Sequence, residues 1–317
     1  MSNKEQVLPK LLSLTLSRRD LLRATGAAAL TGLLPAAWGA AAAPLRLRII
    51  PATGERIPAV GLGTSDAFET RTETALGSLR EVLARFHALG GRLIDTSPTY
   101  GNAEAVVGRL AAELHLTDRL FLATKVHEVG RQAGVAQMEA SQRRLGRRRL
   151  DLIQVHNLVD VNTQLATLQR WKAEGLVRYI GITHYRVGAF EALERLMRTM
   201  PLDFVQLNYS VATPDAEQRL LPLARERGIA VLVNRAFEDG YLFRVTRGQA
   251  LPAWAAEFDC ASWAQFFLKY VLANDAVTCV IPATSKPRHL VDNMKAGVGR
   301  LPGADTRARM RNLIQRV

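Results

Sequence analysis

The sequence predicts a (β/α)8 TIM barrel that occupies residues 44–317 as one domain. Three observations carry this prediction. Short apolar, β-branched runs alternate eight times with stretches of helical periodicity, the repeat is roughly thirty residues long, and no change of composition interrupts it. Runs that are apolar throughout are typical of parallel strands buried on both faces. An open doubly wound sheet would usually have a glycine-rich turn after its first strand, and Gly61-Leu62-Gly63 does not continue into that motif.

The alternation gives the expected elements in order. Strands are expected at residues 60–63, 92–96, 120–126, 150–156, 179–183, 204–209, 230–235 and 279–282. Helices are expected at residues 78–89, 103–114, 135–145, 163–174, 187–200, 216–227 and 262–272. Ahead of the barrel, apolar residues on both sides of 51–55 predict an N-terminal β-hairpin that closes the barrel bottom.

Residues 1–43 are expected to be a twin-arginine signal peptide. Arg18 and Arg19 precede a moderately apolar stretch, 24–37, and a small-residue run precedes Pro44. The stretch is too short for a stable membrane anchor, which needs ~20 apolar residues. The expected partner is therefore the twin-arginine export machinery, and the expected location is the periplasm. The alternative is an amphipathic N-terminal helix in a cytoplasmic protein.

The formal net charge is +13, with basic clusters at residues 143–149 and 300–316. Such clusters can mark nucleic-acid binding. The first cluster follows an amphipathic helical pattern and has no interleaved aromatic residues, so it is interpreted as a solvated helix end and no nucleic-acid partner is expected. An anionic cofactor or substrate accounts for part of the remaining charge. Cys260 and Cys279 follow no motif spacing and are expected to be free thiols.

Four polar side chains come from three consecutive strand ends. Asp95 ends the second expected strand and Tyr100 follows it by five residues, while Lys125 and His156 come at the ends of the third and fourth strands. The carboxyl ends of barrel strands gather the active groups, and neighbouring strands are only ~4.8 Å apart. We therefore expect these four side chains to meet at the mouth of the barrel.

Each of the four has a role if the reaction is the reduction of a carbonyl group. Tyr100 would protonate the developing alkoxide, and the Lys125 ammonium would lower the phenol pKa, which is ~10 when unperturbed. Asp95 would hold Lys125 charged and oriented. His156 would hydrogen-bond the carbonyl oxygen of the substrate. A cofactor must supply the hydride, because no side chain can.

The sequence resembles the aldo/keto reductases over essentially all of residues 44–317. The segments that carry the resemblance are AVGLGT, IDTSPTYGNAE, FLATKV, DLIQVHN, AEGLVRYIGITHY, FVQLNYS and IPATSKPRHLVDNM. The resemblance implies a (β/α)8 barrel that reduces an aldehyde or ketone with NADPH, with NAD as the less favoured cofactor. It maps the catalytic tetrad of the family onto Asp95, Tyr100, Lys125 and His156.

The resemblance also implies which residues hold the nicotinamide. Thr183, His184 and Gln206 would hold its carboxamide, although the family usually has asparagine at the position of His184. Tyr209 would stack on the face of the ring, and Thr64 would line the cofactor.

At the phosphate end, Arg235 stands where the family has a Tyr-Ser-Pro-Leu segment, and it would bind the diphosphate by charge. The residues that would hold the adenosine phosphate are Thr284, Lys286, Arg288 and Asn293. The two cations among them favour NADP over NAD.

Two other functions remain as alternatives. A barrel that retains NADP without catalysis would be an exported binding or regulatory protein, but a complete tetrad serves no purpose in a pure binder. A metal-dependent hydrolase would need clustered ligands such as an H-x-H pair, whereas His127 and His184 are scattered, so no metal site is expected. A monomer is expected, and the long loop 237–262, with Tyr241, Phe243 and Trp254, is expected to form a substrate wall.

Overall fold

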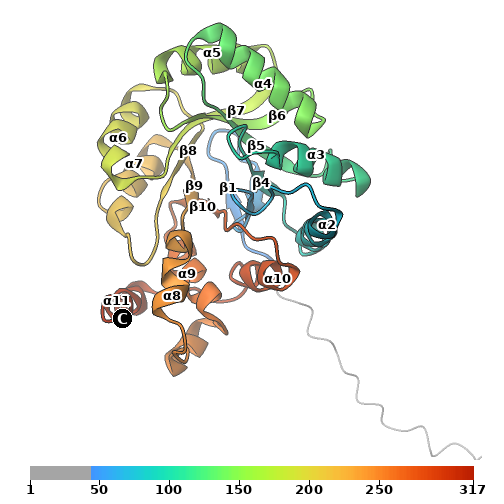
Figure 1. Cartoon of the computed structure of the whole chain (residues 1–317). Coiled ribbons are helices and arrows are strands. Elements are labelled where there is room, and N and C mark those ends of the chain that lie inside the picture. Colours follow the sequence, from blue (N-terminus) through green and yellow to red (C-terminus); the bar gives the residue numbers. More distant parts are fainter. Residues whose placement is uncertain (1–43) are drawn as a thin grey trace, which may run out of the picture. The chain divides into compact units, whose positions relative to one another are not determined.

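The eight-stranded parallel sheet of this protein returns on itself. The computed structural model describes residues 44–317 (Figure 1), and within them each strand pairs with the next in chain order. The strands are β3 (Leu62–Gly63), β4 (Leu93–Asp95), β5 (Phe121–Val126), β6 (Leu150–His156), β7 (Val177–His184), β8 (Phe204–Asn208), β9 (Ala230–Asn234) and β10 (Val277–Val280). Parallel bridges from Val60 to Val280 and from Gly63 to Ala283 join the last strand to the first. The predicted (β/α)8 barrel is confirmed.

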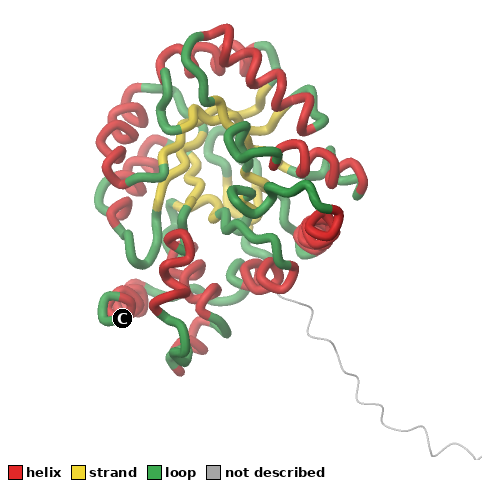
Figure 2. The backbone as a smooth tube through the Cα atoms, in the orientation of Figure 1, coloured by secondary structure: helices red, strands yellow, loops and turns green. Residues whose placement is uncertain are grey.

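Helices surround the strands on the outside of the barrel (Figure 2). They are α2 (Glu73–Ala88), α3 (Ala103–Glu113), α4 (Arg131–Leu145), α5 (Val161–Ala173), α6 (Phe190–Thr199), α7 (Leu220–Arg227), α8 (Tyr241–Val245), α9 (Trp263–Leu272), α10 (Pro287–Lys295) and α11 (Ala304–Ile314). Helix α2 begins earlier than predicted because Thr72 caps it, with its hydroxyl accepting the backbone N–H of Ala75. The eighth strand also begins earlier than predicted, at Val277, which pairs with Val231 of β9.

The alternation of side chains along the strands creates two apolar cores. The outer core packs the strands against the helices. The inner core fills the barrel with large side chains such as Phe121, Tyr179 and Phe204. Both cysteines are free and buried, and Cys279 belongs to the inner core.

The hairpin of β1 (Leu47–Ile49) and β2 (Arg56–Pro58) closes one end of the barrel. Its residues Ile50 and Ile57 belong to the inner core, together with the first residues of β4, β5 and β8. The hairpin therefore seals the end at which the strands begin. As a result, the site can open only at the opposite end, where the strands finish.

The predicted signal peptide, residues 1–43, lies outside the described residues. Within residues 44–317, no helix combines the length and the apolar character needed to cross a membrane.

Candidate active site

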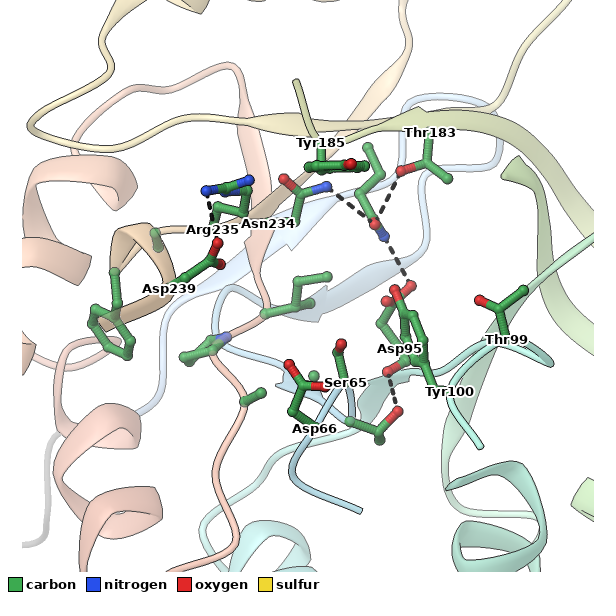
Figure 3. Close-up of a pocket in the computed structure, with 18 of the residues that line it drawn as sticks. Ser65, Asp66, Asp95, Thr99, Tyr100, Thr183, Tyr185, Asn234, Arg235 and Asp239 are labelled. Carbon is green, nitrogen blue, oxygen red and sulfur yellow. Dashed lines mark hydrogen bonds and ion pairs between the residues drawn. The ribbon is translucent and has the colours of Figure 1, made fainter. Parts of the chain in front are cut away.

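A cavity of about 770 Å³ opens at the carboxyl ends of the strands (Figure 3). Its walls come from the ends of β3, β4 and β6–β9 and from the loops that follow them, together with the loop after β10. The residues that line it include Thr64, Ser65, Asp66, Glu69, Asp95, Thr99, Tyr100, His156, Asn157, Thr183, Tyr185, Gln206, Asn234, Arg235, Phe237, Asp239 and Phe243. This is the end of a barrel at which catalytic groups gather.

Lys125 and Asp95 form an ion pair at the floor of this cavity, which Asp95 lines. The Lys125 side chain is fully buried, and its Nζ donates to Asp95 Oδ2 at 2.7 Å and to the carbonyl of Thr96 at 2.8 Å. Burial, the largest single influence, lowers the pKa of Lys125, but Asp95 and Tyr100 together raise it more, so the net shift is upward. The other carboxylate oxygen of Asp95 accepts from the amides of Gln154 and Gln206, at 3.2 and 2.8 Å. Lys125 is therefore held charged and in one position.

The ring of Tyr100 lies against this ion pair. Lys125 Nζ is 4.8 Å from the centre of the Tyr100 ring, and the ring meets His156 edge-on at 5.9 Å between centroids. Burial raises the pKa of Tyr100, while the charge of Lys125 lowers it and that of Asp95 raises it; the net shift is upward. The lowering of the Tyr100 pKa by Lys125 was predicted, but the effect of burial was not, and burial outweighs that of Lys125. Tyr100 consequently keeps its proton at neutral pH.

His156 stands at the end of β6 as a neutral imidazole. Burial, with the charge of Lys125 as the next cause, lowers the pKa of His156 from 6.5 to about 3. Its Nδ1 faces the hydroxyls of Ser97 and Thr99 at 3.2 and 3.4 Å. The structure thus brings all four residues of the predicted tetrad together at one barrel mouth.

A chain of side-chain amides and hydroxyls forms the opposite wall (Figure 3). Gln206 Oε1 accepts from Thr183 Oγ1 at 3.0 Å and from Asn234 Nδ2 at 3.3 Å. Among the described residues, the Oδ1 atom of Asn234 has no hydrogen-bond partner although it is buried. An unpartnered acceptor on a cavity wall suits the NH₂ group of a carboxamide. Thr64, also on the wall, is fixed by a hydrogen bond from its hydroxyl to the carbonyl of Asp95 at 3.0 Å.

A second cavity of about 370 Å³ adjoins the first. The two share the lining residues Phe237, Phe243 and Ala283. The rest of the second cavity is lined by Ser262, Trp263, Ala264, Thr284, His289, Asp292 and Asn293. Together the two cavities suit an elongated ligand with a polar group at one end and an aromatic base at the other.

The sequence model of the Aldo/keto reductase family matches residues 59–308. This chain belongs to the aldo/keto reductase family, a family of oxidoreductases. It is 29% identical over 248 residues to the methylglyoxal reductase YeaE of Escherichia coli, covering 75% of this chain and 84% of that protein. The aldo-keto reductase YhdN of Bacillus subtilis is 28% identical over 210 residues, 60% of this chain and 61% of that protein. A Klebsiella pneumoniae aldo/keto reductase, solved with NADP and acetate, has the same fold with a TM-score of 0.70 and 23% identity, over 82% of this chain and 93% of that one.

In this aldo/keto reductase, Tyr209 does not lie where the resemblance implied. Its ring is fully buried, and its hydroxyl contacts Glu217 and Arg307 in a polar network that also includes Tyr270. It is not among the residues that line either cavity, so the structure lends no support to the stacking of Tyr209 on a nicotinamide ring, which stays a prediction. Tyr209 is the first residue after β8, and its side chain points outward, toward α9 and α11.

Tyr185 is an aromatic residue of the cavity wall that was not among the predicted site residues. The neighbouring His184 was expected to hold the carboxamide but does not line the cavity. Its Nδ1 accepts the backbone N–H of Arg186 at 3.1 Å, and its ring stacks on Tyr185 at 5.5 Å. The available signal was that Tyr185 is the first residue after a strand end.

Arg235, the residue predicted to bind a diphosphate, lines the cavity. Its guanidinium pairs with Asp239 at 2.7 Å and lies 5.6 Å from the centre of the Tyr185 ring. Its backbone is in the left-handed region, with φ of 54°. This conformation turns the chain sharply at the end of β9 and places Arg235 above Tyr185.

The predicted phosphate-end residues divide into two groups. Thr284 and Asn293 line the second cavity, whereas Lys286 and Arg288 are exposed and line neither of the two cavities. Residues 289, 292 and 293 share one face of α10, and Arg288 lies off that face, whereas Lys286 precedes the helix as its N-cap residue with an extended backbone. Lys286 and Arg288 were predicted from their charge alone, without knowledge of which face of α10 is turned toward the cavity.

The loop 237–262 lines the cavities with only one of the three aromatic residues singled out in the sequence, although Phe237 also lines both. Phe243 lines both cavities, but Tyr241 is exposed and Trp254 packs against Phe258 and Phe266. As for metals, residues 44–317 contain no group of three or more His, Cys, Asp or Glu side chains arranged to hold an ion.

Proposed function

We propose that this aldo/keto reductase reduces an aldehyde or ketone to an alcohol with NADPH, and that Tyr100 is the general acid. The observation that carries the proposal is the position of the fully buried Lys125, which is paired with Asp95 and lies 4.8 Å from the centre of the Tyr100 ring. Burying an ammonium costs several kcal/mol unless it is paired. A buried ammonium beside a phenol stabilises the phenolate that remains after the phenol has given up its proton.

The side chains divide the work of the reduction. Tyr100 gives its proton to the carbonyl oxygen, and Lys125 stabilises the phenolate that remains. Asp95 keeps Lys125 charged. When bound, a reduced nicotinamide supplies the hydride. Neutral His156 hydrogen-bonds the same oxygen and so sets the direction from which the substrate approaches.

The residues of both cavities fit a nicotinamide dinucleotide. Thr183, Gln206 and Asn234 would hold the carboxamide, since Asn234 Oδ1 has no partner among the described residues. Arg235 would bind the diphosphate, and Thr284 and Asn293 would hold the adenosine end. NADP is proposed over NAD because related barrels of this family were solved with NADP or NADPH.

The substrate class is a small carbonyl compound. Support comes from the relatives YeaE and DkgB of Escherichia coli, both named methylglyoxal reductases, which are 29% and 26% identical to this chain. We further propose that the protein is exported through the twin-arginine pathway to the periplasm and acts as a monomer. This part rests on the sequence pattern of residues 1–43.

The test is turnover by the purified protein with NADPH and a panel of small aldehydes that includes methylglyoxal. We expect NADPH oxidation that Tyr100→Phe abolishes, while NADPH still quenches the protein fluorescence of that variant. Tyr241→Phe is the matched control, because Tyr241 is an exposed tyrosine that does not line the cavities. Equal turnover by wild type and Tyr100→Phe would refute the role of Tyr100. NADPH binding without turnover by wild type would instead favour the alternative function, a barrel that retains NADP without catalysis.

A further inference from the structure

The walls of the two cavities contain a single permanent cation. Among the described residues that line them, only Arg235 is an arginine or lysine. Its guanidinium lies 5.6 Å from the centre of the Tyr185 ring, and its Nε is buried without a hydrogen-bond partner in residues 44–317. A guanidinium has several N–H donors, and buried donors are normally satisfied. Arg235 therefore has N–H groups to offer to an anionic ligand.

An acid of the same wall already pairs with this cation. The Asp239 carboxylate lies 2.7 Å from the Arg235 guanidinium, and both side chains line the first cavity (Figure 3). Solvent reaches 69% of the Asp239 side chain, so the acid can move away from its partner. A negatively charged diphosphate would be attracted by Arg235 and repelled by Asp239. The carboxylate and a diphosphate therefore compete for one guanidinium.

The backbone of segment 235–240 turns Asp239 back toward Arg235. Positive φ angles of 54°, 50° and 49° occur at Arg235, Glu238 and Asp239, in a region that few non-glycine residues adopt. The N–H of Glu238 donates to the carbonyl of Arg235 at 2.8 Å, and its carboxylate accepts from the buried Ser210 hydroxyl. Such a backbone persists only where surrounding contacts hold it. The fold of the segment, and not only the attraction between two side chains, therefore places Asp239 beside the cation.

We propose that Asp239 is a built-in competitor of the cofactor, which occupies Arg235 in the free protein and gives way when the diphosphate of a nicotinamide dinucleotide binds. The inference rests on the proposed function, which assigns the diphosphate to Arg235. The apparent affinity for a ligand falls with the fraction of protein whose binding group is free. Asp239 therefore weakens the binding of NADPH and NADH alike, since both contain the diphosphate, and it favours their release.

The experiment is a fluorescence titration of the purified protein with NADPH and, separately, with NADH. We expect Asp239→Asn to lower both Kd values about two- to fivefold, the range for an ion pair exposed to solvent. Asparagine tolerates the left-handed backbone as aspartate does, so this variant removes the charge and keeps the turn. Asp118→Asn is the matched control, because it removes an equal charge from an exposed acid that lines neither cavity. It should leave both Kd values unchanged.

A second pair of variants tests whether Asp239 acts through Arg235. In the Arg235→Gln background, Asp239→Asn should improve binding less than it does in wild type, because no cation remains to be released. The proposal is overturned if Asp239→Asn leaves the Kd unchanged, if it gives an equal gain in both backgrounds, or if Asp118→Asn gives the same gain.

The outcome also separates this inference from the proposed reaction. Dinucleotide binding with the expected pattern but no reduction of any carbonyl would support the competition and refute the reaction. Turnover with NADPH and no gain from Asp239→Asn would refute the competition alone. If neither nucleotide binds to wild type or to any of the variants, both are refuted.

Discussion

The ammonium of Lys125 on β5 donates to the carboxylate of Asp95 on β4 at 2.7 Å, and solvent reaches 0% and 4% of the two side chains. Adjacent strands in register bring the two residues together, since Asp95 pairs with Ala123 two residues before Lys125. The pair therefore contributes to the stability of the barrel and, in the proposed reaction, to proton transfer at its mouth. These two roles can be separated.

Lys125→Met is expected to lose activity and about 3–5 kcal/mol of unfolding free energy, because it leaves the Asp95 charge buried without its partner. Lys125→Met/Asp95→Asn should recover much of the stability but none of the activity. Urea unfolding of the set, read as a double-mutant cycle, measures the coupling. Additive losses in the double variant would contradict the pairing.

Asp66→Asn is expected to make Tyr100 more acidic. The charge of Asp66 is one of the influences that raise the Tyr100 pKa, so its removal lowers that pKa. A reductase needs the protonated phenol, and the alkaline limb of its pH–kcat profile should therefore move to lower pH. Asp118→Asn, a change at an exposed acid that does not line the cavity, serves as the control. A limb that stays in place or moves upward would count against Tyr100 as the acid.

Neutral, buried His156 should make the protein less stable in acid. The pKa of His156 is 6.5 in the unfolded chain and about 3 in the native state. The unfolded state therefore binds the additional proton between these values, and stability falls as pH drops below 6.5, by at most about 1.4 kcal/mol per pH unit. His156→Gln should lose less stability than wild type over that range. Equal slopes in thermal melts across the range would show that the ring is charged or exposed.

Tyr185 and Tyr209 should respond differently to NADPH. Tyr185 lines the cavity, so Tyr185→Ala is expected to weaken NADPH binding about three- to tenfold, the value of one aromatic contact. Tyr209→Phe should leave the Kd unchanged but reduce stability by about 1 kcal/mol or more, because its hydroxyl satisfies Glu217 and Arg307. Fluorescence titration and thermal melts compare the two. The reverse result would restore Tyr209 as the stacking residue.

The sequence predicts the barrel and the meeting of the tetrad because both follow from strand order. Asp95, Lys125 and His156 lie within strands, whose alternation fixes which way a side chain points. Tyr185 and Tyr209 each lie one residue beyond a strand, where the conformation of the loop decides which way a side chain points. The strand pattern therefore could not show that Tyr185 lines the cavity and that Tyr209 is buried away from it. Arg235 is a further case. Its positive φ places its side chain above Tyr185, and the pattern of apolar residues does not predict a backbone angle.

The positions of Ser97 and His289 depend on three-dimensional contacts for a different reason. Ser97 is a small residue in the loop after β4, and only the structure shows that it contacts His156 Nδ1. His289 reaches the second cavity because α10 turns that face inward, while the longer cations beside it in sequence lie elsewhere. Counting charges along a segment does not replace knowing the orientation of its helix.

The two cysteines, both buried and unbonded, have a consequence for where such a barrel can work. Burial raises the pKa of the Cys260 thiol to about 11 and that of Cys279 as well, so neither sulfur offers the thiolate that oxidants and disulfides attack. The fold contains no cross-link that a reducing environment could break and no reactive thiol that an oxidising one could damage. A polypeptide built this way can mature in one redox milieu and operate in another.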